Sequence, residues 1–196
     1  MASSSSRRRS LLESIGLKFE VVESHFEEDS VDKEYDPYYL AKFLALEKAK
    51  DVFERFNQCI VVGADTMVIC RGEVYGKPKD EHDARRMIEN LNGSEHDVVT
   101  GVAILAKNGQ SVVNSDVTKV FFNKLSEEEI DAYIKTKDYI GKAGAYGIQG
   151  KGAVLVRKIE GSYSNVVGLP IELMCNMFRQ IGESVYKSWG NVSNLR

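Results

Sequence analysis

The chain has 196 residues, 43% hydrophobic and 28% charged, with a formal net charge of −3. That length can bury a large core, and the near-balanced charge argues against general binding to a nucleic-acid polymer or an acidic membrane. No stretch approaches the roughly 20 apolar residues of a membrane helix. Three cysteines lack metal-ligand spacing, which predicts reduced thiols, with Cys59 and Cys70 in the core, and a cytoplasmic location.

The predicted elements alternate between helices and strands along the chain. In chain order they are a helix over 10–15, a strand over 19–22, a helix over 37–56, strands over 59–70 and near 74, a helix from 80 to 91, strands over 98–106, 110–113 and 117–122, a helix from 126 to 135, a strand over 154–159 and a helix over 170–181. Asp36-Pro37 is typical of a helix start. Ser126 and Glu129 match a capping box.

The remaining segments are predicted to be irregular, namely an acidic loop over 23–35, a Gly-rich stretch over 143–152, a turn over 160–165 and a loose tail from about 188. Because some strands are hairpin-linked, the pattern favours an α/β fold with a central mixed sheet over a purely parallel one. No repeat or linker divides the sequence. We therefore expect a single domain over 1–196.

Asp65 is the most informative polar position. It lies in Val61–Val68 (VVGADTMV), and apolar residues continue beyond it to Ile69. A lone carboxylate in such a strand is costly unless it is paired, bound to metal or open to a cavity. The alternative is an acid that caps a turn. The pattern favours a functional carboxylate, one that binds a divalent cation or takes a proton from water.

The first ten residues combine hydroxyls and arginines at the start of a helix, in the segment SSSSRRRS over 3–10. Free amides at a helix start and the forked donors of arginine suit phosphate. The alternatives are a solvated basic tail and an organelle transit peptide. Leu11 and Leu12 weaken the first alternative, because an apolar helix begins at once and would hold the arginines in place.

Two lysines are candidates for binding phosphate. Lys77 lies between Gly76 and Pro78, which restrict the backbone, and Lys48 lies one helical turn from Leu44, beside an apolar stripe. The alternatives are an ordinary turn lysine and a lysine that extends to water.

The Gly-rich stretch lets the backbone approach a ligand closely, and Gln149 within it can offer both a donor and an acceptor to a base edge. We expect the three histidines, His25, His82 and His96, to be surface residues, because none has ligand spacing.

In their order along the chain these fragments resemble the Maf family of nucleotide pyrophosphatases. The resemblance extends from Ser3 to about Leu173. Its motifs are Ser3-x-Ser5-x-Arg7-Arg8, Glu27-Glu28, Lys48-Ala49, Gly63-Ala64-Asp65-Thr66, Gly76-Lys77-Pro78, His96 to Gly101, Lys142 to Gly150 and Asn165 to Pro170. It implies a fold like that of the inosine-triphosphate pyrophosphatases, with a twisted mixed sheet and a cleft between two lobes. Such proteins often form homodimers.

The resemblance also implies hydrolysis between the α- and β-phosphates with Mg²⁺ or Mn²⁺. It makes Asp65 the proton acceptor and, with Glu28, a metal ligand. The basic residues that bind phosphate would be Arg7, Lys48 and Lys77. The substrate-binding set would be Ser3, Ser5, Arg7, Arg8, Thr66 and Gln149.

Thr66 and Gln149, among the positions at which the family's branches differ, match the branch that acts on dTTP and UTP and modified pyrimidine analogues. The alternatives are a pyrophosphatase for modified purine nucleotides and a nucleotide-binding regulator of cell division without turnover. Ser6 stands where relatives usually have Pro, which predicts a less rigid helix start.

Overall fold

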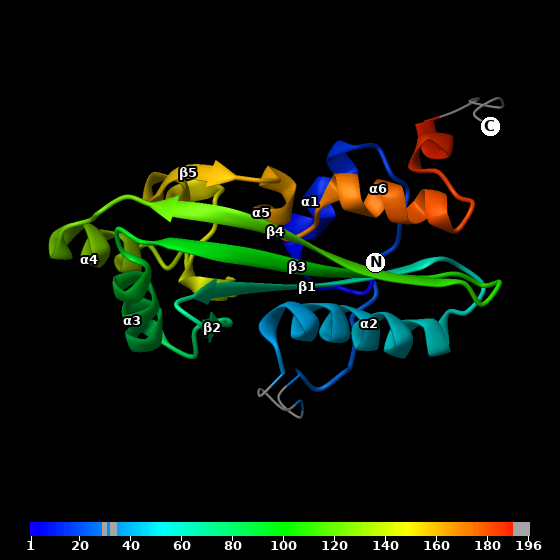
Figure 1. The fold of residues 1–196 in the computed structure, drawn as a ribbon, viewed down its shortest axis with the longest axis horizontal. Helices are drawn as coiled ribbons and strands as arrows, with labels where there is room; N and C mark the ends of the chain where they lie inside the picture. Colours follow the sequence, from blue (N-terminus) through cyan, green and yellow to red (C-terminus); the bar gives the residue numbers. More distant parts are fainter. Residues whose placement is uncertain (29–30, 32–34, 190–196) are drawn as a thin grey trace. The chain divides into compact units, whose positions relative to one another are not determined.

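A computed structural model describes residues 1–28, 31 and 35–189 (Figure 1). The chain forms two compact units. Unit 1 comprises Met1–Asp65, Thr100–Ser115 and the described residues from Gly168 to Trp189, and unit 2 comprises Thr66–Val99 and Asp116–Val167. Within the described part of the chain, no helix has the length and apolar character needed to cross a membrane.

Helices and strands alternate as predicted. The elements are α1 (Ser6–Ser14), α2 (Pro37–Arg55), β1 (Val61–Cys70), β2 (Glu73–Tyr75), α3 (Glu81–Leu91), β3 (Glu95–Leu105), β4 (Ser111–Phe122), α4 (Glu127–Lys135), β5 (Val156–Glu160), α5 (Tyr163–Val167) and α6 (Ile171–Gln180), with 3₁₀ helices η2 (Ala143–Ala145), η3 (Gly150–Leu155) and η4 (Val185–Trp189). The strands form one sheet in the order β2-β1-β3-β4-β5. The fold class predicted from the sequence is confirmed.

The sheet is mainly antiparallel, as the pairs β1–β2 and β4–β5 show. Parallel pairing enters at the N-terminus, where Ala2 forms isolated bridges with both Val22 and Gly63. The strand predicted over 19–22 is wrong, because within the described residues Val22 forms a single bridge, to Ala2, and one bridge does not make a ladder. The strands predicted over 110–113 and 117–122 are one continuous β4.

Side-chain hydrogen bonds at the helix starts explain where the helices begin. Asp36 accepts from the backbone amides of Tyr38 and Tyr39, both at 3.0 Å, and α2 begins at Pro37 as predicted. The capping box of Ser126 and Glu129 opens α4. Helix α1 begins four residues earlier than predicted, because Ser5 caps it and Ser6 takes the first helical position.

Unit 1 packs helices on both faces of its strands. Helix α2 covers one face, and α1 and α6 cover the other (Figure 1). Since side chains alternate along a strand, Val61 and Gly63 face α2. Gly63 is required there, because a Cβ on it would lie 2.2 Å from the carbonyl oxygen of Ala45. Helix α2 therefore lies directly on the backbone of β1.

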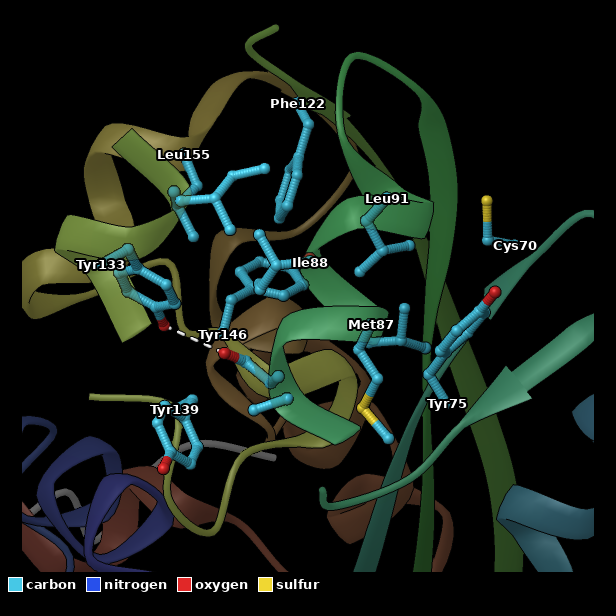
Figure 2. Packing of buried hydrophobic residues seen from close by; sticks show 14 of the residues in the cluster. Cys70, Tyr75, Met87, Ile88, Leu91, Phe122, Tyr133, Tyr139, Tyr146 and Leu155 are labelled. Atoms are coloured by element: carbon cyan, nitrogen blue, oxygen red, sulfur yellow. Dashed lines mark hydrogen bonds between the residues drawn. The ribbon is translucent and has the colours of Figure 1, made fainter. Parts of the chain in front are cut away.

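Unit 2 has its own core, drawn in Figure 2, where side chains from α3, α4 and the Gly-rich segment meet. We use "Gly-rich segment" for residues 143–152. Two sequence predictions are wrong for this protein's cores. His96 is not on the surface but only 3% exposed, because it shares the inward face of β3 with Val98. Cys59 is exposed rather than buried, because β1 begins two residues later and Cys59 lies in the turn before it.

Candidate active site

Asp65 lies on β1 with its side chain 10% exposed. The alternation that turns Val61 and Gly63 toward α2 also turns Asp65 toward that helix. Its carboxylate meets the ammonium of Lys48, with 2.5 Å between Nζ and Oδ1. The carboxylate that the sequence singled out is therefore paired and does not cap a turn. An isolated charge at this depth would be strongly unfavourable, so the pair explains how the strand tolerates it.

Lys48 bridges two carboxylates. Besides Asp65, its Nζ lies 2.7 Å from Oε1 of Glu28, and its side chain is only 12% exposed. The alternative that Lys48 extends to water is wrong, because α2 lies so close to β1 that the side chain ends at Asp65. Asp65, Lys48 and Glu28 thus form one charged cluster in unit 1, and we call it the carboxylate cluster.

Helix α1 brings Arg8 to a fixed position. The guanidinium donates through Nε to the carbonyl of Gly168 at 2.6 Å and through Nη1 to the hydroxyl of Ser3 at 3.1 Å. Ser5 caps the helix by accepting from the Arg8 backbone amide at 3.4 Å. With Leu12 buried in the core of unit 1, the segment is packed structure and not a solvated basic tail. Ser6 therefore starts a capped helix without the usual Pro.

Arg8 of α1 interacts electrostatically with the carboxylate cluster. Burial is the largest influence and lowers the pKa of Arg8 from its ordinary value, while the charges of Asp65 and Glu28 act in the opposite direction. Arg7 is near enough to lower the same pKa. Arginine remains charged under such influences, since its ordinary pKa is above 12. Three cations and two carboxylates thus gather in unit 1.

In unit 2, the turn that carries Lys77 is bonded to the Gly-rich segment. The backbone amide of Gly144 donates to the carbonyl of Gly76 at 3.0 Å. Gly144 has φ of 65°, and a Cβ there would lie 2.9 Å from Cγ2 of Val68, so both the conformation and the space require glycine. Lys77 itself is exposed.

The Gly-rich segment is held at both ends, and its exposed middle carries Gln149. Asp138 accepts from the amide of Gly152 at 3.1 Å and pairs with Lys142 at 2.9 Å. Gly152 packs so closely that a Cβ on it would lie 2.3 Å from the carbonyl oxygen of Gly147. The segment therefore has a fixed path on either side of Gln149.

The predicted site residues thus fall into two sets. Unit 1 brings together Ser3, Ser5, Arg7, Arg8, Glu28, Lys48 and Asp65. Unit 2 holds Thr66, Lys77 and Gln149, of which Lys77 and Gln149 belong to segments joined by a hydrogen bond. Their catalytic and binding roles stay predictions, as does a cleft that accepts a triphosphate.

Sequence reasoning missed one feature of unit 2, the contact of His96 Nε2 with the hydroxyl of Tyr146 at 2.7 Å. A signal was available in the sequence. His96 lies two residues before Val98, so in an extended chain the two side chains share one face, and the apolar Val98 predicts that this face points into the core.

The donors for a divalent cation are limited. Among residues 1–28, 31 and 35–189 there is no group of three or more His, Cys, Asp or Glu side chains able to hold a metal ion. Two carboxylates, Asp65 and Glu28, do converge on one positive charge, the ammonium of Lys48. Mg²⁺ is commonly held by one or two carboxylates with phosphate oxygens and water, so this pair of carboxylates fits such an ion when a triphosphate supplies the other ligands.

Comparison with known proteins identifies the family. The family model described as Maf-like protein matches residues 1–181. A dTTP/UTP pyrophosphatase of Ruminiclostridium cellulolyticum is 42% identical over 188 residues, which cover 95% of this chain and 97% of that protein. Proteins of the same name from Geobacillus sp. and Alkaliphilus oremlandii are 46% and 49% identical, covering 93% and 87% of this chain and 97% and 89% of their own length.

Among solved structures, a nucleoside-triphosphatase/dITP/XTP pyrophosphatase of Mycobacterium abscessus covers 92% of this chain and 93% of its own at 15% identity, with a TM-score of 0.43. That likeness is too weak to bear on activity. The family match and the relatives together show that the chain belongs to the Maf family.

Proposed function

We propose that this chain hydrolyses dTTP and UTP, with modified pyrimidine analogues, to the nucleoside monophosphate and pyrophosphate. The observation that carries the proposal is the carboxylate cluster, in which Lys48 holds Asp65 and Glu28 beside Arg8. The names of the relatives, at 42–49% identity, support the same substrates.

Asp65 acts as the proton acceptor. It takes a proton from the water that attacks the α-phosphorus, the new oxygen–phosphorus bond forms, and the bond from the α-phosphorus to the oxygen that bridges to the β-phosphate breaks. Pyrophosphate leaves with the electron pair of that bond. The contact with Lys48 orients the carboxylate of Asp65 before water arrives, so little reorganisation is needed during the reaction.

The basic residues bind the phosphates and stabilise the leaving group. Arg7 and Arg8 supply forked donors at the start of α1, where free backbone amides add to the attraction for anions. Lys77 is a further proposed phosphate-binding cation. Since Lys48 already contacts two carboxylates, its main effect is to hold them in place rather than to bind phosphate on its own.

A divalent cation, Mg²⁺ or Mn²⁺, completes the proposed site. When bound, it neutralises charge on the phosphates and lowers the pKa of water. Asp65 and Glu28 are the residues that would hold it, and Lys48 limits how they move.

Thr66 and Gln149 are the proposed base-binding residues. A hydroxyl and an amide can satisfy the edge of a pyrimidine that covers them, and a base that covers them but leaves them unpaired is rejected by a large factor, roughly 10⁴-fold in favourable cases. Selectivity for dTTP and UTP would then depend on where the Gly-rich segment places Gln149.

The test is a panel of nucleoside triphosphates with Mg²⁺ and with Mn²⁺, with release of pyrophosphate as the readout. We expect dTTP and UTP to react fastest, and Asp65→Asn to lower kcat on them by about 10³-fold, within the range for a lost general base. Asp51→Asn is the matched control, because it removes the charge of an aspartate of unit 1 whose partners are Arg55 and the backbone amide of His25, and Asn keeps an oxygen that can accept from that amide. Its kcat should equal that of the wild type.

Other outcomes identify the alternatives. Fastest release from a modified purine triphosphate would replace the proposed substrate class. Binding of triphosphates without any pyrophosphate would favour a regulator that does not turn them over. Normal kcat in Asp65→Asn would refute the role of Asp65 as proton acceptor.

A further inference from the structure

A buried histidine that the proposed mechanism does not use lies in the core of unit 2. His96, on β3, is 3% exposed, and its Nε2 lies 2.7 Å from the hydroxyl of Tyr146. Its ring meets Phe122 and Tyr146 edge-on, at centroid distances of 4.9 Å and 5.4 Å. Nδ1 of His96 has no hydrogen-bond partner among the described residues. A buried polar ring with one partner is costly, so the contact with Tyr146 is the feature that requires explanation.

Tyr146 belongs to the Gly-rich segment, three residues before Gln149. Its aromatic ring lies in the core beside Tyr133 and Leu155, with Ile88 of α3 (Figure 2). The residue before it, Ala145, has φ of 62°, a conformation that non-glycine residues rarely adopt. The hydroxyl of Tyr133 donates to the carbonyl of Ala145 at 3.0 Å and holds this backbone. The chain is thus clamped where it turns toward Gln149.

The hydrogen bonds of Tyr133 and His96 restrain different parts of the Gly-rich segment. Tyr133 holds the backbone carbonyl of Ala145, whereas His96 holds the hydroxyl at the end of the Tyr146 side chain and so restricts how that side chain can turn. Among the described residues, the next side chain that holds the segment is Asp138, which accepts from the amide of Gly152. Gly147 packs against Gly152 so closely that a Cβ on Gly152 would lie 2.3 Å from the Gly147 carbonyl oxygen, which limits how far Gly147 can adjust. A change in the orientation of Tyr146 would therefore be passed to Gln149 through only two residues.

We infer that His96 and Tyr146 are positioning residues for nucleobase selectivity, which place the amide of Gln149 through their hydrogen bond. This inference rests on the proposed function, because it assigns Gln149 to the base. Neither residue touches the substrate. Loss of their bond should impair discrimination between bases more than it impairs the chemical step.

The variant that tests the bond is Tyr146→Phe, which keeps the ring and removes only the hydroxyl. The matched control is Tyr139→Phe, since Tyr139 is 7% exposed in the same core cluster. The first readout is amide hydrogen exchange of the peptide spanning 146–152, which requires no catalysis. We expect exchange to speed up by about tenfold in Tyr146→Phe and to be unchanged in Tyr139→Phe.

The second readout is selectivity, measured as kcat/KM for dTTP divided by kcat/KM for dGTP. Tyr146→Phe should lower this ratio by about tenfold, mostly through the KM for dTTP. In a Gln149→Ala background the same change should leave the ratio unaltered, because the amide that it positions is gone. His96→Gln, whose amide can donate to or accept from the Tyr146 hydroxyl, should keep more of the selectivity than His96→Leu.

Each result bears on one claim. Unchanged exchange over 146–152 in Tyr146→Phe would overturn the inference whatever the activity. Faster exchange with an unchanged ratio would overturn the selectivity role and leave only a structural one. If wild-type protein releases no pyrophosphate from any triphosphate, the proposed function fails and the selectivity role fails with it, while the exchange data still decide whether His96 and Tyr146 position the segment.

Discussion

Unit 1 and unit 2 position their candidate residues by different physical means. In unit 1 the carboxylate cluster is held by charge, with both carboxylates contacting the ammonium of Lys48. In unit 2 the segment carrying Gln149 is held mostly by neutral contacts, namely glycines under close packing, backbone hydrogen bonds and the pair His96–Tyr146, with the carboxylate of Asp138 at its end. The difference predicts that substitutions in unit 1 impair turnover of every triphosphate, whereas those in unit 2 change which base is accepted.

The largest effect that sharpens this comparison is expected from Lys48→Met. The substitution keeps the length of the side chain but removes the ammonium that contacts both Asp65 and Glu28. Breaking a buried pair in this way costs about 3–5 kcal/mol of the free energy of unfolding. We expect kcat/KM to fall by about 10²-fold for dTTP and dGTP alike, because the base site is untouched. Urea unfolding and pyrophosphate release measure the two effects.

Lys50→Met is the control for this experiment. Lys50 is on the same helix, and its pair with Glu47 has 51% of the lysine side chain exposed, so its loss should cost about 0–1 kcal/mol. Equal unfolding midpoints for the two variants would contradict the importance of the buried pair. A selective loss of dTTP over dGTP in Lys48→Met would contradict the division of roles between the units.

In unit 2, a pH effect of intermediate size is expected from His96. Burial lowers its pKa from 6.5 to about 4. As pH falls below 6.5 the unfolded chain takes up a proton that the folded chain takes up only near pH 4, so acid favours the unfolded state. Stability present above pH 6.5 is therefore lost on acidification, by about 3 kcal/mol between pH 7 and pH 4.

The measurement is the free energy of unfolding by urea across that pH range. His96→Gln cannot take up this proton and should lose about 3 kcal/mol less than the wild type on acidification. His82→Gln, which removes an exposed histidine, should follow the wild type. Carboxylates titrate in all three proteins, so the difference between them isolates His96. Identical pH dependence in wild type and His96→Gln would contradict a neutral buried ring.

The elements that the sequence predicted well have local signals. Asp36-Pro37 places the start of α2, the capping box places α4, and an apolar run interrupted by one carboxylate identifies Asp65. Lys48 was recognisable because its place beside the apolar stripe of α2 forces it toward the sheet. These signals need only neighbouring residues. Glu28, the remaining member of the carboxylate cluster, has no such signal and was assigned only through the family resemblance.

Contacts between distant residues were harder to predict. His96 and Tyr146 are 50 positions apart, and no local pattern pairs them. The continuity of β4 was missed for a related reason, since Asn114 and Asp116 are poor strand formers, yet pairing within the sheet outweighs this local preference. Cys59 was misplaced because an apolar run does not show at which residue its strand begins.

The smallest expected effect that separates the two units is a change in KM when a helix cap is removed. Ser5 caps α1 and Ser126 caps α4, each by accepting from a backbone amide three residues on. Replacing either by Ala should cost about 1 kcal/mol of stability, the usual value for a lost cap. Only Ser5→Ala should also raise the KM for dTTP, by several-fold, because α1 carries Arg7 and Arg8 and presents its free amides to phosphate. Thermal unfolding and steady-state kinetics test both statements, and an equal rise in KM for Ser126→Ala would mean that KM reports general loosening rather than the start of α1.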